Sequence, residues 1–283
     1  MDASPRRSEN QPQSPIGIFD SGVGGLSVLR AVQARLPGAP IVYLADQGHV
    51  PYGPRPLEQV RDFATRITGF MLDQGACLIV VACNAASAAA LRHLRERFPA
   101  TPFVGMEPAV KPAAEHTRTG TVGVLATPAT FQGALYGSVI ERFAQGVTVL
   151  EDTCPGLVGQ IEAGELNGPL TRHILETALR PMLDRGIDTI VLGCTHYPFV
   201  IPLIQSIAGP DVRVIDPAPA VARQVERVLE AQNLLKTGAD PAGPAPVRFI
   251  TTGDAFRFRC QIDQLLGVQA KTEAIPPLEE YYA

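Results

Sequence analysis

The stretch Met71–Cys83, MLDQGACLIVVAC, joins the end of a helical pattern to a glycine, a short apolar strand and a cysteine. The same order recurs at Met182–Cys194, MLDRGIDTIVLGC, where seven of thirteen positions are identical at a constant offset of 111 residues. Self-similarity of this kind indicates two related structural units in one chain. A helix that leads directly into a buried strand is typical of the crossover connections of parallel sheets.

Strands and helices alternate outward from these two stretches. Apolar residues spaced three and four apart predict a helix from Leu57 to Met71, and a weaker echo aligns Gly17–Ser21 with Gly123–Thr127 at an offset of 106 residues. The other predicted helices are Leu26–Arg35, the segment after Asn84 to about Arg97, Thr130–Phe143, Pro169–Arg185 and Ala218–Gln232. The predicted strands are Ile16–Phe19, Ile41–Leu44, Leu78–Val81, Thr121–Leu125, Thr189–Leu192 and Val212–Ile215. The sequence therefore predicts an α/β fold with parallel sheets in two halves.

The composition argues against several classes of protein. The chain has 283 residues, of which 46 % are hydrophobic and 18 % charged, so it can build a sizeable core. Its net charge of −4 gives no reason to expect a nucleic-acid partner, and no apolar run approaches the roughly 18–20 residues of a membrane helix. Five cysteines without an export signal favour reduced thiols in the cytoplasm. Residues 1–14 are polar, and we expect them to be a disordered lead-in.

Cys83 and Cys194 each follow a predicted strand, at the edge where parallel sheets bind ligands. We expect each of them to precede a helix, with Asn84 and Thr195 as N-cap residues. A helix N-terminus favours the thiolate form of a cysteine. One cysteine here would most simply be a small buried apolar residue. Two at matched positions favour a shared chemical role.

Three chemistries suit two thiols. A disulfide redox pair would be expected in a Cys-x-x-Cys motif, which the sequence lacks. A zinc site from Cys83, Cys194, His196 and Cys154 would lack the close cysteine spacing of zinc motifs. The third chemistry places an acid and a base on opposite faces of a carbon next to a carboxylate, an arrangement that a pseudo-twofold chain can supply. A thiol with an unperturbed pKa of about 8.5 needs only modest tuning for this task.

Two alternatives lie outside thiol chemistry. Pyridoxal phosphate would need a Schiff-base lysine, and Lys111, Lys236 and Lys271 do not stand at a strand end beside a glycine-rich phosphate loop. This disfavours the cofactor. The chain could also be a non-catalytic binding protein for an amino acid or a carboxylate, although such a protein has no use for two opposed thiols.

The glycine-rich turn within Phe19–Val28, FDSGVGGLSV, offers backbone N–H groups to an anion. It lacks the last glycine of the dinucleotide-binding pattern, so it favours a small carboxylate. Asp20 makes better sense beside a substrate ammonium group, or as a carboxylate that tunes a thiol. His196 could orient a thiolate, whereas Glu162, on a short predicted helix, is by itself expected to be a surface charge.

Taken together, the motifs resemble those of the glutamate racemases, in the cofactor-independent aspartate/glutamate racemase family. The resemblance rests on IGIFDSGVGGLSV, PYGPRP, VVACNAAS, VLGCTHYP and ITTGD, and it runs from about Ile16 to Gly267. It implies two pseudo-symmetric, doubly wound parallel-sheet domains with the active site between them. These would comprise residues 15–105 plus 216–270 and residues 106–215, with a tail at 271–283. The implied reaction interconverts L- and D-glutamate by two-thiol proton transfer without a cofactor, and supplies D-glutamate for peptidoglycan.

The resemblance also implies roles for individual residues. Cys83 and Cys194 match the catalytic thiols, and Asp20, His196 and Glu162 match the groups that assist them. The matched substrate-contact positions are Asp20, Ser21, Tyr52, Gly53, Asn84, Ala85, Thr195 and His196.

Ala85 is the one departure from the family pattern, which usually has threonine at this position. We therefore expect weaker substrate binding or a compensating group, since a hydrogen bond is worth about 0.5–1.5 kcal/mol net. Aspartate racemases share the fold and the cysteine pair, but Tyr52, Gly53 and His196 favour glutamate as the substrate. The partner expected from the resemblance is the small-molecule substrate, with no metal and no membrane. A homodimer is a further expectation from the family.

Overall fold

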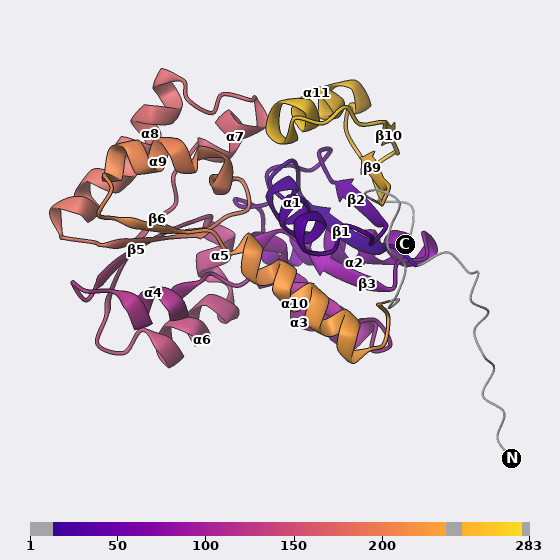
Figure 1. The fold of residues 1–283 in the computed structure, drawn as a ribbon, viewed down its shortest axis with the longest axis horizontal. Helices are drawn as coiled ribbons and strands as arrows, with labels where there is room; N and C mark the ends of the chain where they lie inside the picture. Colours follow the sequence, from indigo (N-terminus) through magenta and orange to yellow (C-terminus); the bar gives the residue numbers. More distant parts are fainter. Residues whose placement is uncertain (1–13, 236–244, 279–283) are drawn as a thin grey trace, which may run out of the picture.

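The computed structural model describes residues 14–235 and 245–278, which form two α/β halves lying side by side (Figure 1). The first half contains a six-stranded sheet in the order β10-β9-β2-β1-β3-β4, and the second a four-stranded sheet in the order β6-β5-β7-β8. Every strand pair in both sheets is parallel. The predicted α/β fold with two parallel sheets is therefore confirmed.

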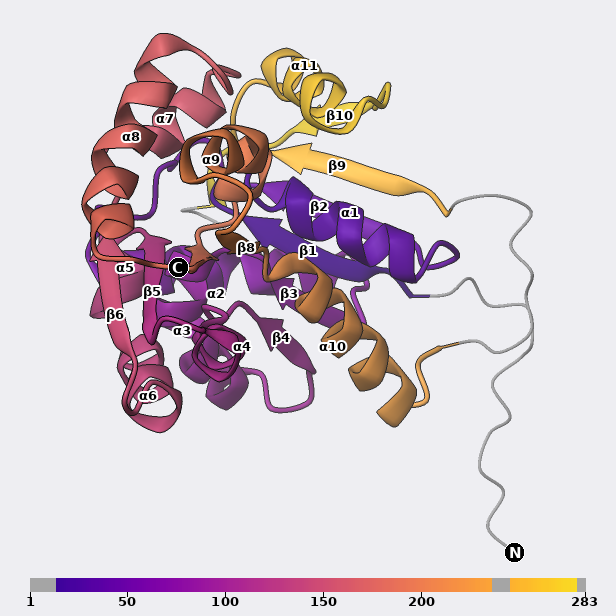
Figure 2. The same cartoon turned by 60° about the vertical axis from the view of Figure 1, so that its left-hand side comes forward.

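The first half combines the N-terminal segment with the end of the chain. Its strands are β1 (Ile16–Asp20), β2 (Ile41–Ala45), β3 (Leu78–Val81), β4 (Phe103–Gly105), β9 (Val247–Thr251) and β10 (Thr272–Ala274). Its helices are α1 (Leu26–Arg35), α2 (Leu57–Asp73), α3 (Asn84–Arg97), α10 (Ala218–Ala231) and α11 (Ala255–Leu266). Figure 2 shows α10 beside α1, while β9 extends the sheet beyond β2.

The second half is formed by the middle of the chain. Its strands are β5 (Thr121–Ala126), β6 (Thr148–Asp152), β7 (Thr189–Gly193) and β8 (Arg213–Ile215). Its helices are α4 (Val110–His116), α5 (Pro128–Gln132), α6 (Ala134–Phe143), α7 (Leu157–Glu162), α8 (Pro169–Asp184), the 3₁₀ helix η1 (Tyr197–Val200) and α9 (Ile201–Ala208).

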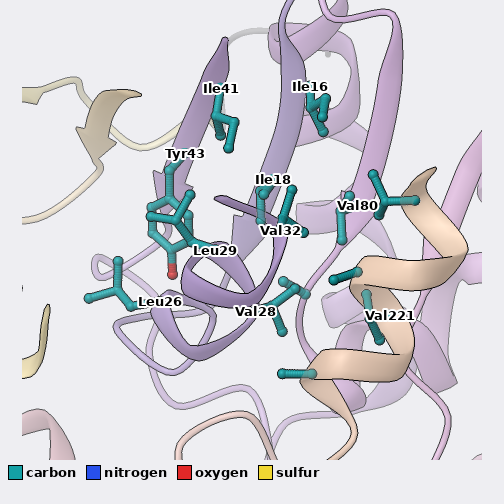
Figure 3. Close-up of a cluster of buried hydrophobic side chains, with 14 of the residues drawn as sticks. Ile16, Ile18, Leu26, Val28, Leu29, Val32, Ile41, Tyr43, Val80 and Val221 are labelled. Atoms are coloured by element: carbon teal, nitrogen blue, oxygen red, sulfur yellow. The ribbon is translucent and has the colours of Figure 1, made fainter. Parts of the chain in front are cut away.

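The first sheet is buried on both faces because its side chains alternate between two apolar clusters. On one face, Ile18 of β1 and Val80 of β3 lie beside Val28 of α1 and Val221 of α10 (Figure 3). On the other face, Phe19 packs in a cluster formed largely by α2 and α3. Helices therefore cover both faces, and in parallel sheets of this kind ligands bind beyond the carboxyl ends of the strands.

The predicted helix Thr130–Phe143 is wrong in one respect, because it is two helices that meet at Gly133. Gly133 has an extended backbone, with φ −70° and ψ 134°. An ideal Cβ on Gly133 would lie 2.6 Å from the Cβ of Ala88, so this break lets α5 approach α3 of the first half closely. The break therefore serves the contact between the two halves.

The predicted tail at 271–283 begins too early, because Thr272–Ala274 pairs with β9 as strand β10. The other domain boundaries remain a proposal. Of the lead-in predicted at residues 1–14, residues 1–13 lie outside the described residues. No helix in the described ranges is long and apolar enough to cross a membrane.

Candidate active site

A small cavity lies between the two halves. Its walls are formed mainly by segments that follow β1, β2 and β3 of the first half and β5 and β7 of the second. The lining residues are Ser21, Pro51, Tyr52, Gly53, Cys83, Asn84, Ala85, Thr127, Val158, Cys194, Thr195 and His196.

One thiol enters this cavity from each half. Cys83 follows β3 and Cys194 follows β7, and each is only 5 % exposed. The predicted N-cap roles of their neighbours are wrong: Cys83 itself occupies the N-cap of α3, and Asn84 is the first helical residue. Thr195 caps no helix either, since its hydroxyl donates to Oδ2 of Asp20 at 2.9 Å.

Cys83 lies among groups that keep it protonated. Its Sγ lies 4.0 Å from Oγ of Ser21. Burial raises the pKa of Cys83 well above its ordinary value, and the nearby charge of Asp20 adds to this, against a smaller lowering by the backbone N–H of Ala86. The free site therefore holds Cys83 as a thiol, ready to give a proton.

Asp20 is itself fully buried beneath this thiol, at the end of β1. It accepts hydrogen bonds from the backbone N–H of Ser21 at 2.6 Å and from Thr195. Burial raises the pKa of Asp20, and the charge of His196 and the hydrogen bond from Thr195 only partly oppose that effect. Asp20 thus links the strand ends of the two halves.

Cys194 has a different set of partners. Its Sγ lies 3.7 Å from Nδ1 of His196, whose Nε2 lies 2.6 Å from Oε1 of Glu162. Burial lowers the pKa of His196, but its hydrogen bonds to Cys194 and Glu162 outweigh burial and raise that pKa well above 6.5. These surroundings of His196 therefore favour its imidazolium form.

Glu162, predicted by itself to be a surface charge, is buried, with 7 % of its surface exposed. Its Oε1 accepts the backbone N–H of Val23 at 2.8 Å, so the glycine-rich turn does bind a carboxylate, but one of the protein's own. An ideal Cβ on Gly22 would lie 2.0 Å from that oxygen, which explains why this position has no side chain. Burial raises the pKa of Glu162, but hydrogen bonds from His196, Val23 and Gln47 outweigh it and lower that pKa.

Asn84 is the clearest sign that the cavity takes a polar ligand. It is 3 % exposed and lines the cavity, yet neither its amide oxygen nor its amide nitrogen has a partner among the described residues. An unpaired buried amide costs about 1–3 kcal/mol, so such groups are rare unless a ligand completes them. The side chain can donate to one ligand group and accept from another.

The segment that contains Tyr52 and Gly53 also lines the cavity. The hydroxyl of Tyr52 donates to Oδ2 of Asp46 at 2.5 Å, which fixes the ring. The carbonyl of Gly53 accepts the backbone N–H of Ala129, at the start of α5, at 3.0 Å. Ala85 lines the same space without a hydroxyl, and Thr127 brings one from the second half.

The zinc hypothesis receives no support from the geometry. Among residues 14–235 and 245–278, no group of three or more His, Cys, Asp or Glu side chains is arranged to hold a metal ion. The nearest partners of His196 are a thiol and a hydrogen-bonded carboxylate.

Residues 26–225 match the model of the family described as Asp/Glu/Hydantoin racemase, which spans most of the chain. The chain belongs to this family. It is therefore an amino-acid racemase, an isomerase. The resemblance drawn from the sequence motifs is confirmed.

Individual relatives of this racemase cover nearly its whole length. The glutamate racemase of Roseiflexus sp. (strain RS-1) is 51 % identical over 256 residues, which make up 90 % of this chain and 93 % of the relative. The crystal structure of glutamate racemase isoform RacE1 from Bacillus anthracis has a TM-score of 0.82 at 33 % identity, and covers 93 % of this chain and 97 % of its own.

A third relative of the racemase was solved with a ligand. Glutamate racemase from Francisella tularensis in complex with D-glutamate has a TM-score of 0.81 at 31 % identity, and covers 95 % of this chain and 99 % of its own. The two-domain α/β architecture of the racemase is thus shared over most of the chain.

The structure brings nearly all predicted site residues of the racemase together. Ser21, Tyr52, Gly53, Cys83, Asn84, Ala85, Cys194, Thr195 and His196 line the cavity, while Asp20 and Glu162 stand behind the thiols. Sequence reasoning missed Thr127, Val158 and Pro51. The weaker internal echo could have found Thr127, because it aligns that residue with Ser21.

Proposed function

We propose that this racemase interconverts L- and D-glutamate by proton transfer between two thiols, without pyridoxal phosphate. The observation that carries the proposal is that Cys83 and Cys194 enter one small cavity from different halves of the molecule. The names of the relatives, and the D-glutamate in the Francisella tularensis complex, support glutamate as the substrate.

In the proposed reaction, the thiolate of one cysteine removes the α-proton of the substrate. The electron pair of the broken C–H bond moves into the adjacent carboxylate, and the thiol of the other cysteine delivers its proton to the opposite face of the carbon. One C–H bond breaks, another forms, and the two cysteines exchange their protonation states. Proton exchange with water, or the reverse reaction, restores the starting state.

The surroundings of the two thiols suit their roles as base and acid. His196 and Glu162 assist Cys194, because a cationic imidazole beside Sγ can supply a proton to it and stabilise its thiolate. Asp20 and Ser21 assist Cys83. Asn84, Thr195, Tyr52, Gly53 and Ala85 contact the substrate in this proposal, which places them around the α-carbon.

The proposal extends to the place of the reaction in the cell. D-glutamate would be made in the cytoplasm and supplied to peptidoglycan synthesis. A gene for this chain should rescue a bacterium that requires D-glutamate, and a gene with both cysteines replaced should not. The homodimer expected from the family belongs to the same proposal, and sedimentation of the purified protein measures it.

The reaction is tested by circular dichroism of L-glutamate in D₂O, with purified protein and no added pyridoxal phosphate. We expect the signal to decay to zero while deuterium appears at the α-carbon. L-aspartate is the matched control, because Ala85 leaves the cavity without one hydroxyl. An unchanged L-glutamate signal would contradict the proposal, and decay with aspartate alone would move the substrate to aspartate.

Replacing Asn84 with alanine is expected to raise KM for glutamate about tenfold or more, because two hydrogen bonds worth about 0.5–1.5 kcal/mol each are lost. The stability of the free protein should stay equal or increase, since no internal partner is left behind. Initial rates and thermal unfolding measure the two effects. A clear loss of stability with unchanged KM would show that Asn84 is structural.

A further inference from the structure

We propose that Gln47 and Gln261 are positioning residues for the Cys194 side of the site, and that they act through Glu162. This inference rests on the proposed function, because it assigns the two amides to one of two proton transfers. Neither residue lines the cavity. Gln47 follows β2, and Gln261 lies on α11, which the chain reaches only after it has left the second half.

The two side chains join the first half to Glu162 in a continuous run of hydrogen bonds. The hydroxyl of Thr251, in the ITTGD motif, donates to Oε1 of Gln47 at 3.0 Å. Nε2 of Gln47 donates to Oε1 of Gln261 at 2.7 Å. Nε2 of Gln261 then donates to the backbone carbonyl of Glu162 at 2.6 Å. Thr251 of the ITTGD motif is thereby connected to Glu162 through Gln47 and Gln261.

The same amides also face the free oxygen of the carboxylate. Oε1 of Glu162 is occupied by His196 and by the N–H of Val23. Oε2 lies 3.4 Å from Nε2 of Gln47 and 3.5 Å from Nε2 of Gln261. Without these donors, a buried carboxylate oxygen would lose its partners, and Glu162 would be free to turn its Oε1 away from His196.

The orientation of both amides is fixed by their surroundings. If either amide were turned over, it would place an oxygen against the carboxylate of Glu162, which can accept hydrogen bonds but cannot donate them when charged. Gln261 is also buried, with 6 % of its surface exposed, so its hydrogen bonds are shielded from competing water. This is the arrangement expected of groups that hold a charged residue in one position.

If the role of Gln261 were purely structural, its hydrogen bonds would only attach α11 to the second half. Gln264, one turn further along α11, provides the comparison. Its Nε2 donates to the carbonyl of Gly164 at 2.8 Å, so it crosses to the same half without touching Glu162. Gln264→Met is therefore a matched control for Gln261→Met, with the same residue type, helix and substitution.

The test uses variants that keep one thiol. With Cys83→Ala, only Cys194 can exchange the α-proton of glutamate with D₂O, and with Cys194→Ala, only Cys83 can. Gln261→Met and Gln264→Met are each introduced into both backgrounds. Deuterium incorporation from L- and D-glutamate is followed by NMR. Exchange by Cys83 in the Cys194→Ala background reports whether each glutamine substitution leaves the fold and the substrate site intact.

We expect Gln261→Met to slow exchange by Cys194 about tenfold or more and to leave exchange by Cys83 unchanged. Gln264→Met should change neither. If Gln261→Met slows both sides equally, or neither side, the positioning role is overturned while the proposed function stands. If neither single-thiol parent exchanges a proton, the two-thiol mechanism fails, and the inference falls with it.

Gln47→Met provides an independent check, because Gln47 lies in a loop rather than on α11. Gln47→Met should also slow the exchange of the α-proton by Cys194. Since the two amides act in one run, the double variant should lose little more than the stronger single variant. Fully additive losses would contradict a shared action on Glu162.

Discussion

Replacing either Cys83 or Cys194 with alanine is expected to abolish the racemisation of glutamate while the fold survives. Each turnover uses both thiols, so loss of either removes an acid–base group that typically contributes about 10²–10⁴ in rate. L-to-D and D-to-L conversion should fail together for the same reason. Both side chains are small, and replacing a sulfur by hydrogen costs a buried site only about 1 kcal/mol.

The measurement is decay of the circular dichroism signal from each enantiomer, beside a thermal unfolding curve of each variant. Cys260→Ala is the matched control, because Cys260 is exposed on α11, away from the cavity. Normal turnover by either the Cys83 or the Cys194 variant would exclude the two-thiol mechanism. A binding protein would keep its affinity for glutamate in both variants and show no racemisation in the parent.

Replacing Glu162 with glutamine is expected to lower kcat/KM about 10- to 100-fold, because the charged partner of His196 is lost and a hydrogen bond to a charged group is worth about 1.5–3 kcal/mol. Substrate binding should change little, since Glu162 does not line the cavity. The loss should therefore appear in kcat rather than in KM. An effect on KM alone would contradict the role of Glu162 behind His196.

The same substitution should change how stability depends on pH. Because the folded pKa of His196 is raised, its stabilising contribution is complete below about pH 6.5 and is lost as pH rises through the folded value. Because the folded pKa of Glu162 is lowered, its contribution is complete above about pH 4.5 and is lost as pH falls through the folded value. The His196–Glu162 pair therefore stabilises the fold most between about pH 4.5 and about pH 6.5.

Urea unfolding at several pH values measures this effect. The wild-type free energy of unfolding should decline as pH rises above about 7, and the decline should be shallower in Glu162→Gln. All other titratable groups are present in both proteins, so the difference between the two curves isolates the contribution of the His196–Glu162 pair. Parallel curves would show that Glu162 does not set the charge of His196.

The parts of the fold that follow local rules could be predicted closely. Helix α1 and strand β3 were predicted with the residue bounds that the structure shows, because apolar spacing and the flanking turns define them locally. The two thiols could be predicted because the internal repeat places them at equivalent strand ends. The break at Gly133 could not, since it depends on contact with Ala88 across the two halves.

The burial of Glu162 shows the limit of reasoning from residues alone. Its sequence neighbourhood fits an exposed helix end, yet the N–H of Val23, the imidazole of His196 and the amide of Gln261 approach it from three distant parts of the chain. Gln47 and Gln261 were missed for the same reason. Only tertiary structure reveals which polar residues meet, because hydrogen bonds of this kind leave no periodic signal in the sequence.

The two thiols have unlike partners, a cationic imidazole beside Cys194 and a serine with a buried carboxylate beside Cys83. L- and D-glutamate are mirror images with equal free energies in water, so the equilibrium constant of the proposed reaction is one. The ratio kcat/KM must then be identical in the two directions, whatever the protein does. The unlike partners can therefore lower KM for one enantiomer only if kcat for that enantiomer falls in the same proportion.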